Sequence, residues 1–443
     1  MNYFILTFIF YLQNYIGSSI GSSSFDGNIF EFLFLFSIIV LISKVKIAKI
    51  VYYLFTTLYF FQFAYLNYFG KTISSTDIYL FITHLQESFE TIYHYNDFLI
   101  WPLILFLSTL LFIHKMKIER STIDLKTILF LAIISFYLNG KFNDFTLIFF
   151  KEVVNINTNN KILIQNKSNI RNPIKQDQIN IILVIGESMR AKEFLSKKSH
   201  FFENSSYKTI YAGATNTDIS IPLLLNGAYR PKGIDLSNNL FRLAHDNNFT
   251  THFISAQNKG YLKYIEPYLD QKSIHNYQIL GTQNDHDLLS QLKQIDLDKS
   301  NFIVLQMQGE HSPYIYAPNI LSSDTIQTKY QKSLEYSFTM LDHITTYITE
   351  KSNKKYLFIF TSDHGEQIGE NGHFGHNKFE QEVYKVPFVF SSSFDLDTKE
   401  INSHKDIYHI IESYLGYENT KIDQIKIRVN GTMMTEEDGF REF

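Results

Sequence analysis

The chain contains no cysteine among its 443 residues. This absence excludes disulfide scaffolds, cysteine-ligated zinc, iron–sulfur clusters and thiol nucleophiles. The chain also lacks an excess of either charge, because 40 lysines and arginines stand against 44 aspartates and glutamates, for a net charge of −4. Such a balance argues against a nucleic-acid-binding protein that relies on bulk positive charge, so we expect no nucleic-acid partner.

Charge is scarce in the first third of the chain. Residues 1–150 carry 18 charged side chains, whereas the remaining 293 residues carry 66. The mean hydropathy of −0.09 therefore averages two different parts. The N-terminal part is apolar, and the C-terminal part has the composition of an ordinary soluble domain.

The apolar part contains segments that predict membrane-spanning helices, which need about 20 mostly apolar residues each. We identify five of them: 1–25, 28–42, 50–70, 98–114 and 127–140. The fifth is short, and a buried core helix in a four-span protein is the alternative interpretation. We predict a transmembrane domain over 1–144, a linker with an interfacial segment over 145–178, and a catalytic domain over 179–443.

Basic residues predict the orientation of these spans. Two short loops carry nearly all of them, with Lys44, Lys46 and Lys49 in the first and Lys115, Lys117, Arg120 and Lys126 in the second. By the positive-inside rule both loops are cytoplasmic, which places the C-terminal part outside. Because no clear small-residue cleavage site follows residues 1–17, we interpret the first segment as an uncleaved signal anchor.

Beyond residue 178, apolar runs alternate with helical patterns. The runs that predict strands are Asn180–Ile185, Thr250–Ser255, Asn301–Met307, Tyr356–Thr361 and Val386–Ser391, and the helical patterns include 329–350 and 404–417. Alternation of this kind predicts an α/β domain with a mostly parallel sheet. Ligands of such sheets bind at the carboxyl ends of the strands.

Carboxylate and imidazole side chains follow three of the predicted strands. Glu187 follows the first strand, Glu310 and His311 follow a later one, and Asp363 and His364 follow the next. Asp and His side by side suit a divalent cation such as zinc or manganese. Because the carboxyl ends of parallel strands meet at one edge of the sheet, the three clusters together predict a metal site there.

Hydroxyl-bearing residues precede Pro222 in the segment 213–222. Pro222 and the polar residues before it predict the start of a helix, with Thr217 just before that helix. Free backbone N–H groups at a helix start favour anions such as phosphate. A metal that lowers the pKa of the Thr217 hydroxyl would make it a nucleophile. From these residues alone, a capping role for Thr215, Thr217 and Ser220 remains an open alternative.

Four motifs together resemble those of the membrane-bound phosphoethanolamine transferases of Gram-negative bacteria. This family includes the mobile colistin-resistance enzymes and belongs to the alkaline phosphatase and sulfatase superfamily. The motifs are ILVIGESMR, which ends at Arg190, TNTDISIP (215–222), QGEHSP (308–313) and SDHGEQIGENGHFGH (362–376). The resemblance implies an α-helical transmembrane bundle followed by an α/β sulfatase-like domain, in a multi-pass protein of the bacterial inner membrane with its catalytic domain in the periplasm.

The resemblance also assigns roles by position. Glu187, Asp363 and His364 correspond to the family's primary zinc ligands, and manganese is the alternative metal. Thr217 corresponds to the threonine that touches this zinc and becomes phosphorylated. In these relatives a disulfide often braces the nucleophile loop, but Gly213 and Leu223 occupy the two places here. We therefore expect this loop to be held by packing and by the metal.

Further residues correspond to the family's substrate contacts. His311 and His376 match histidines that bind the substrate phosphate or a second zinc, whereas His373 has no clear counterpart and is interpreted as a loop-surface histidine. Thr83 and Glu87 match a Thr and a Glu that contact the lipid substrate, and their spacing would place them on one face of a helix. A solvated amphipathic helix is the alternative interpretation of that segment.

The implied reaction transfers phosphoethanolamine from phosphatidylethanolamine to a cell-surface glycolipid, such as lipid A or the lipopolysaccharide core, through phosphothreonine 217. A phosphoglycerol transferase of the same superfamily would use the same ligand types. The complete Glu, Thr, Asp and His set disfavours a membrane sensor with a degenerate domain. A sulfatase needs a Cys or Ser to form its formylglycine, and the scarcity of charge within the spans disfavours a transporter.

Overall fold

A computed structural model describes residues 1–20, 27–83, 85–94, 96–118, 121–139, 144, 149, 152–153, 171–175, 178–197, 205–395, 400–418, 426–434, 436 and 439–443. The chain forms two compact units. The first comprises Met1–Thr158 together with Glu370–Phe374, and the second comprises Asn159–Gly369 and Gly375–Phe443. Most of the predicted linker, 145–178, lies outside the described residues.

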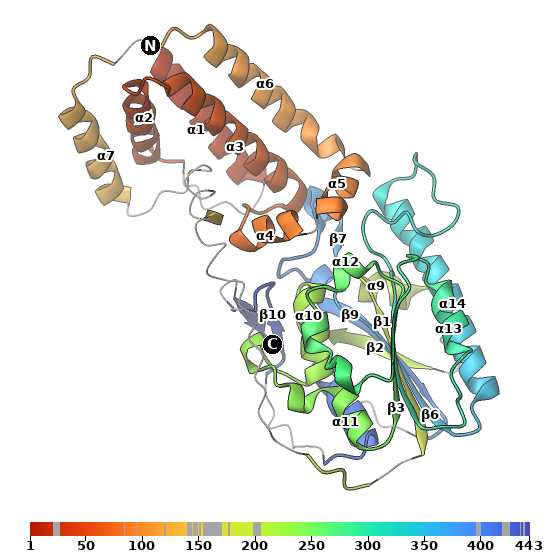
Figure 1. Cartoon of the computed structure of the whole chain (residues 1–443). Helices are drawn as coiled ribbons and strands as arrows, with labels where there is room; N and C mark the ends of the chain where they lie inside the picture. Colours follow the sequence, from red (N-terminus) through yellow and green to blue (C-terminus); the bar gives the residue numbers. More distant parts are fainter. Residues whose placement is uncertain are drawn as a thin grey trace. The chain divides into compact units, whose positions relative to one another are not determined.

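The first unit contains the helices of the N-terminal part (Figure 1). They are α1 (Asn2–Ile20), α2 (Ile29–Ser43), α3 (Ala48–Phe69), α4 (Ser75–Thr83), α5 (Leu85–His94), α6 (Ile100–Lys115) and α7 (Leu125–Asn139). Five of these helices, namely α1, α2, α3, α6 and α7, coincide with the five predicted spans.

Length and hydropathy single out one part of this unit. Among the described residues, only the helical stretch Asn96–Lys115 is long and apolar enough to cross a membrane by those two criteria. Ile29–Ser43 and Leu125–Leu138 are apolar but shorter. Tyr, Asn and Gln side chains in α3 lower its hydropathy despite its 22 residues. The number of spans therefore stays a prediction.

The second unit is built on a seven-stranded sheet with the strand order β2-β9-β6-β1-β5-β3-β4. Its strands are β1 (Ile179–Gly186), β2 (Ser206–Tyr211), β3 (Thr250–Ser255), β4 (Asn276–Ile279), β5 (Asn301–Gln306), β6 (Lys355–Ser362) and β9 (Lys385–Ser392). The pairs β1–β5, β1–β6, β3–β5 and β3–β4 are parallel, whereas β9 is antiparallel to β6 and β2. The predicted mostly parallel sheet is confirmed.

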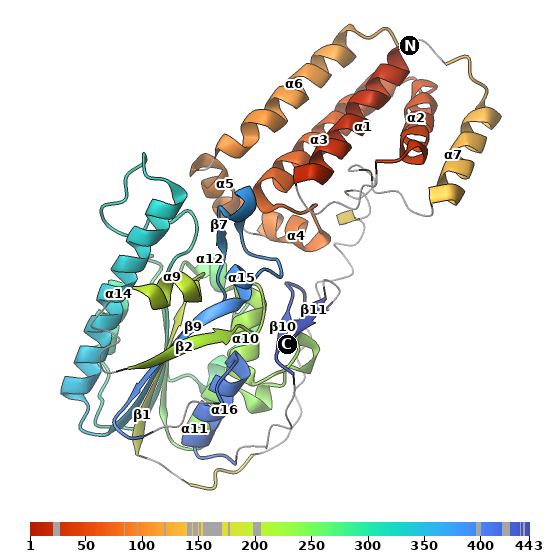
Figure 2. The ribbon, with the colours of Figure 1, turned by 180° about the vertical axis from the view of Figure 1, so that it is seen from behind.

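Helices cover both faces of this sheet. They are α9 (Ala191–Ser196), α10 (Thr217–Asn226), α11 (Leu240–Asp246), α12 (Lys259–Leu262), α13 (His286–Leu292), α14 (Ile326–Lys351), α15 (Gln381–Tyr384) and α16 (His404–Tyr414). Figures 1 and 2 show α10, α11 and α16 on one face of the sheet and α13 and α14 on the other. Two-stranded sheets add β7 (Gln367–Ile368) with β8 (Phe374–Gly375), and β10 (Arg428–Asn430) with β11 (Phe440–Glu442).

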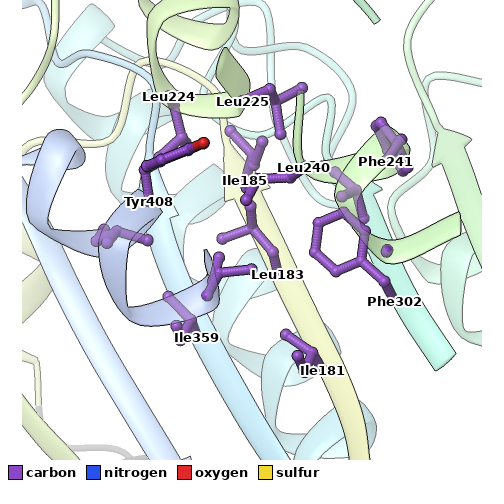
Figure 3. Packing of buried hydrophobic residues seen from close by; sticks show 14 of the residues in the cluster. Ile181, Leu183, Ile185, Leu224, Leu225, Leu240, Phe241, Phe302, Ile359 and Tyr408 are labelled. Atoms are coloured by element: carbon purple, nitrogen blue, oxygen red, sulfur yellow. The ribbon is translucent and has the colours of Figure 1, made fainter. Parts of the chain in front are cut away.

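One large hydrophobic cluster of the second unit lies between the sheet and the helices α10, α11 and α16. Alternate residues of β1, namely Ile181, Leu183 and Ile185, point into this layer because side chains of a strand alternate between its faces. They pack against a large set of buried residues that includes Leu224, Leu225, Leu240, Phe241, Phe302, Ile359 and Tyr408 (Figure 3). Every residue of β1 is buried, as expected for a strand covered on both faces.

The start of α10 differs from its prediction. The helix begins at Thr217 with Asn216 as N-cap, so Pro222 lies inside it rather than at its start. Pro222 has no N–H to donate, yet the helix tolerates it because eight of its ten residues are buried among tertiary contacts. Thr217 is therefore the first helical residue.

Candidate active site

The register of the sheet places the acidic residues of two strands side by side. Gly186 at the end of β1 pairs with Ser362 at the end of β6, so the next residues, Glu187 and Asp363, emerge together. His364 follows directly. One ligand atom from each of Glu187, Asp363 and His364 lies within 4.8 Å of the others, and all three residues are buried.

Backbone donors fix one oxygen of Asp363 and leave the other unpaired. Oδ1 accepts hydrogen bonds from the N–H groups of Ser188 (3.1 Å) and His364 (2.7 Å). Ser188 adopts a left-handed conformation with φ of 58°, an energetically unfavourable state that aims its N–H at this carboxylate. Oδ2 is buried and has no hydrogen-bond partner among the described residues. An unpaired buried carboxylate oxygen is costly, which favours a cation beside it.

The ring of His364 presents a lone pair to the same place. Its Nδ1 lies 2.8 Å from the carbonyl oxygen of Gly365, which only accepts hydrogen bonds, so Nδ1 carries the proton. In the neutral ring, Nε2 is then unprotonated. It lies 3.4 Å from Glu187 Oε1 and 3.4 Å from Asp363 Oδ2. A backbone contact at the far nitrogen is the usual way that a protein orients a metal-binding histidine.

Glu187 completes a cluster of like charges. Burial, followed by the neighbouring charge of Asp363, raises the pKa of the Glu187 carboxyl well above its ordinary value. Two buried carboxylates this close repel each other unless one takes up a proton or a cation lies between them. The electrostatics of the cluster thus favour a bound divalent cation.

Gln257 is a member of the site that the sequence did not reveal. It follows β3, and its Nε2 donates to Glu187 Oε2 at 2.9 Å and to the Met307 carbonyl at 3.1 Å. Gln306 Nε2 in turn donates to Gln257 Oε1 at 3.1 Å. These buried amides therefore orient the Glu187 carboxylate.

Thr217 lies against this cluster at the first position of α10. Its Oγ1 is 3.1 Å from both carboxylate oxygens of Glu187 and 3.2 Å from Nε2 of His364. The hydroxyl therefore stands in contact with two of the three candidate ligands. The helix starts at the same residue, and the first N–H groups of a helix have no acceptor within the helix, which suits an anionic group such as phosphate.

The loop after β5 packs on the backbone of Glu187. Glu310 N–H donates to the Glu187 carbonyl at 3.0 Å. A side chain at Gly309, where φ is 54°, would lie 2.7 Å from the Glu187 nitrogen, so only glycine fits this approach. The buried carboxylate of Asp285 accepts from the N–H groups of Gln308 (2.6 Å) and Gly309 (3.0 Å). Burial raises the pKa of Asp285 to about 6.

The two histidines predicted to contact substrate differ in their surroundings. The ring of His376 lies 4.4 Å from the ring of His364, centroid to centroid, so it borders the cluster. His311 stacks on Tyr261 at 4.9 Å, and its Nδ1 is 2.6 Å from the Ser312 carbonyl. His311 thus follows the loop that packs on Glu187, but neither of these contacts is with a ligand of the cluster.

The remaining predicted residues belong to the first unit. Helix α4 ends at Thr83 and α5 begins at Leu85, so Thr83 and Glu87 lie in successive helices. The side chains of Thr83 and Glu87 lie outside the described part of the chain, and their contact with lipid stays a prediction. His373 lies in Glu370–Phe374, the short segment that groups with the first unit, and is partly buried there.

The residues of the cluster fit a divalent metal. Two carboxylates and one imidazole form the type of ligand set that zinc accepts. The unpaired Oδ2 of Asp363, the lone pair of His364 Nε2 and the two oxygens of Glu187 face the same place. Glu187, Asp363 and His364 would hold the metal, and Thr217 Oγ1, in contact with two of them, is a candidate for a fourth ligand.

Comparison with known proteins places this domain in a family. The family model described as Sulfatase matches residues 179–417, which is more than half of the chain. The chain is also similar to the phosphoethanolamine transferase EptA of Helicobacter pylori, with 21% identity over 290 residues. That alignment covers 55% of this chain and 54% of the relative, so the match spans about half of the relative's length.

Solved structures extend the likeness to both parts of the chain. The integral membrane protein lipooligosaccharide phosphoethanolamine transferase A (EptA) from Neisseria meningitidis is 14% identical, with a TM-score of 0.64 over 94% of each chain. The periplasmic domain of EptC from Escherichia coli, solved as a complex with Zn, is 15% identical, with a TM-score of 0.50 over 63% of this chain and 94% of that one. At these identities the likeness establishes the fold. The predicted fold class, N-terminal helices followed by a sulfatase-like domain, is confirmed.

Proposed function

Because this chain belongs to the sulfatase family, we propose that it transfers phosphoethanolamine from phosphatidylethanolamine to a cell-surface glycolipid, lipid A or the lipopolysaccharide core. The observation that carries the proposal is the contact of the Thr217 hydroxyl with Glu187 and His364. A threonine at that place is a nucleophile for phosphoryl transfer, whereas sulfatase chemistry needs a formylglycine derived from Cys or Ser. The similar EptA proteins of Helicobacter pylori and Neisseria meningitidis are named as phosphoethanolamine transferases, which supports the choice.

The proposed reaction has two displacements at phosphorus. In the first, Thr217 Oγ1 bonds to the phosphorus of phosphatidylethanolamine as the bond to the diacylglycerol oxygen breaks, and that oxygen takes up a proton. In the second, an oxygen of the acceptor bonds to phosphorus, and Thr217 leaves and regains its proton. The intermediate is phosphoethanolamine-threonine.

Each residue of the site has a defined part in these steps. Zinc held by Glu187, Asp363 and His364 would lower the pKa of the Thr217 hydroxyl and offset the negative charge of the phosphate. N–H groups at the start of α10 would bind phosphate oxygens. His376 beside the cluster, with His311, would neutralise phosphate oxygens and pass protons to the leaving oxygen or from the acceptor.

The N-terminal helices explain access to a lipid donor. We propose that this part is a multi-pass transmembrane domain over residues 1–144 in the bacterial inner membrane, and that residues 179–443 form the catalytic domain in the periplasm. Donor and catalyst would then meet at one interface, which replaces a three-dimensional search by a local one. Thr83 and Glu87 are the candidates for donor contact.

Mass spectrometry of the purified full-length protein tests the proposal. Protein from a membrane that contains phosphatidylethanolamine should carry a phosphoethanolamine adduct on Thr217, and Thr217→Ala should carry none. Thr282→Ala, which removes an exposed threonine of the same unit, is the matched control and should keep the adduct. Removal of metal with a chelator should abolish adduct formation, and added zinc should restore it.

The chemical identity of the adduct separates the two transferase alternatives. A phosphoglycerol group on Thr217 would replace the proposal by a phosphoglycerol transferase, and manganese rather than zinc would then be the metal to test. A wild-type protein that binds no divalent ion while it forms the adduct would contradict the metal-dependent mechanism.

A further inference from the structure

The loop that carries Thr217 is held from one side by the main chain and side chain of Asn430. The Thr215 N–H donates to the Asn430 carbonyl at 3.1 Å, and the Gly213 carbonyl accepts from Asn430 N–H (2.9 Å) and Nδ2 (3.0 Å). From another side, the Gly213 N–H donates to Nδ1 of His404 at 3.1 Å. His404 is the first residue of α16 and is 2% exposed.

The same imidazole also reaches the strand that carries the metal ligands. Its Nε2 donates to the carbonyl of Ser362, the residue before Asp363, at 2.9 Å. Ser220 of α10 donates to the Asp363 carbonyl at 2.6 Å and lies 3.2 Å from His404 Nδ1. One ring therefore connects the loop before Thr217, the helix after Thr217 and the end of β6.

Its partners fix the protonation state of this ring. The Gly213 N–H only donates and the Ser362 carbonyl only accepts, so His404 is neutral with its proton on Nε2. Burial lowers the pKa of His404 to about 4, in accord with a neutral ring. Both hydrogen bonds are therefore available at neutral pH.

We propose that His404 is a positioning residue that fixes Thr217 relative to Asp363 and His364. The inference rests on the proposed role of Thr217 as nucleophile. A misplacement of about 1 Å at a reacting group costs about 100-fold in rate, and the hydroxyl lies only 3.2 Å from His364 Nε2. The chain has no cysteine that could brace this loop covalently, so the imidazole supplies a noncovalent connection instead.

The primary test compares His404→Ala with the wild-type chain in vesicles that contain saturating phosphatidylethanolamine. We expect the rate constant for adduct formation on Thr217 to fall about 100-fold, with the donor concentration for half-maximal rate unchanged, because His404 positions the nucleophile and does not contact the donor. Hydrogen exchange of the 213–216 amides should become about tenfold faster, since one hydrogen bond is lost. A wild-type rate constant in His404→Ala would overturn the proposal.

Two variants separate positioning from general loss of stability. His409→Ala removes another buried histidine of α16, whose ring contacts Glu412 rather than the loop. We expect His409→Ala to lower the melting temperature. Hydrogen exchange of the 213–216 amides and the rate constant for adduct formation on Thr217 should stay unchanged. His404→Asn, which keeps a polar acceptor near Gly213, should retain more of the rate than His404→Ala and provides a folded variant if alanine is not tolerated. Equal rate losses in His404→Ala and His409→Ala would contradict the proposal.

A covalent replacement gives a rescue experiment. A Cβ at Gly213 would lie 3.4 Å from the Leu223 Cβ, just below the range of about 3.5–4.5 Å found in disulfides, so a small shift would allow the bond. We introduce Gly213→Cys and Leu223→Cys together in the His404→Ala chain. Oxidation to the disulfide should raise the rate constant for adduct formation at least about tenfold above that of His404→Ala, and reduction should reverse the increase. A disulfide that forms without any recovery would show that His404 acts in another way and overturn the proposal.

The exchange measurement also separates this inference from the proposed function. If the wild-type chain forms no adduct on Thr217, the proposed function fails by itself. If hydrogen exchange of the 213–216 amides is the same in zinc-loaded His404→Ala as in the wild type, the positioning role is overturned. This conclusion holds whether or not an adduct forms on Thr217.

Discussion

Gln257 illustrates how an uncharged residue can orient a candidate metal ligand. Its amide donates to one oxygen of Glu187 and is itself held by Gln306. Without that donor, the Glu187 carboxylate would be less firmly oriented toward Asp363 and His364. Removal of such an outer hydrogen bond typically lowers metal affinity by about 10- to 100-fold.

We therefore expect Gln257→Leu to weaken zinc binding by about 10- to 100-fold at an unchanged ligand set. The measurement is a competition titration of the metal-free protein against a chromophoric chelator. Gln294→Leu, which alters an exposed glutamine of the same unit, is the matched control and should bind zinc as the wild type does. Equal affinities for the two variants would show that Gln257 does not orient Glu187.

His252 on β3 predicts how stability depends on pH. Burial lowers its pKa to about 4, against an ordinary value of 6.5, while Asn301 and Asn276 hydrogen-bond its ring and His275 lies nearby. The unfolded chain therefore binds a proton more readily than the folded one. The contribution of neutral His252 to the free energy of unfolding is fully present above pH 6.5. It is lost as the pH falls from 6.5 to 4, and the loss is about 3 kcal/mol at most.

Denaturant unfolding of wild type and His252→Gln at pH 7.5 and pH 4.5 measures this contribution. We expect the free energy of unfolding to fall less between the two pH values in His252→Gln, because glutamine does not titrate. Identical pH dependence in the two proteins would contradict the assignment.

The sequence identified the charged residues of the site but missed its uncharged contacts. Glu187, Asp363 and His364 stand at the ends of obvious apolar runs, so the place where they meet could be predicted. Gln257 and His404 have no distinctive motif. Their roles arise because β3 lies beside β5 and because α16 begins next to β6, and such neighbours become visible only in the folded chain.

At the scale of elements, strands with continuous apolar runs were predicted to within two residues, and partly exposed strands were missed. Every residue of β1 and β5 is buried, whereas β4 has four residues of intermediate exposure and β2 has several exposed ones. Edge strands such as β2 and β4 are not buried on both faces, so their sequences lack the continuous apolar run that identified the other strands. The start of α10 was placed too late because Pro222 is a common helix-start residue.

The glycine at the end of α10 allows a test of why no side chain fits there. Gly227 is the C-cap with φ of 62°, and a Cβ there would lie 2.4 Å from the ring of Tyr408. We expect Gly227→Ala to destabilise the second unit by about 3 kcal/mol, from backbone strain and from the clash with a buried ring. Thermal or denaturant unfolding measures the change.

Gly281 is the matched control for that variant. It has a similar φ of 65°, but a Cβ there meets nothing within 4 Å. Gly281→Ala should therefore cost only the backbone strain, about 1 kcal/mol. If both variants are destabilised equally, the ring of Tyr408 adds nothing to the cost of a side chain at Gly227.

At the scale of the whole molecule, the division between an apolar helical part and an α/β part follows from composition alone. The number of spans does not, because Tyr, Asn and Gln side chains keep several of the helices below the hydropathy of a typical span. The predicted topology places three spans, α3, α6 and α7, between Lys46 and Lys299.

An odd number of crossings puts these two lysines on opposite sides of the membrane. The cysteine-free chain allows Lys46→Cys and Lys299→Cys to be labelled singly in intact cells with a membrane-impermeant maleimide. We expect Lys299→Cys to be labelled and Lys46→Cys to be protected until the cells are lysed, while the unaltered chain gives no signal. Equal labelling of both variants would show that the chain crosses the membrane an even number of times between the two positions, which would contradict the five-span topology.

The contact between Gly213 and Asn430 sets an order of events during synthesis. The ribosome adds more than 200 residues after Thr217 before Asn430 exists, so the loop that carries Thr217 lacks one of its supports throughout that time. If the α/β part is translocated across the membrane with its N-terminal end first, nearly all of this part must cross before Asn430 can contact the loop. The Thr217 hydroxyl would take its final position only then. The nascent chain would then cross the membrane without a competent nucleophile, and catalysis would start only after export.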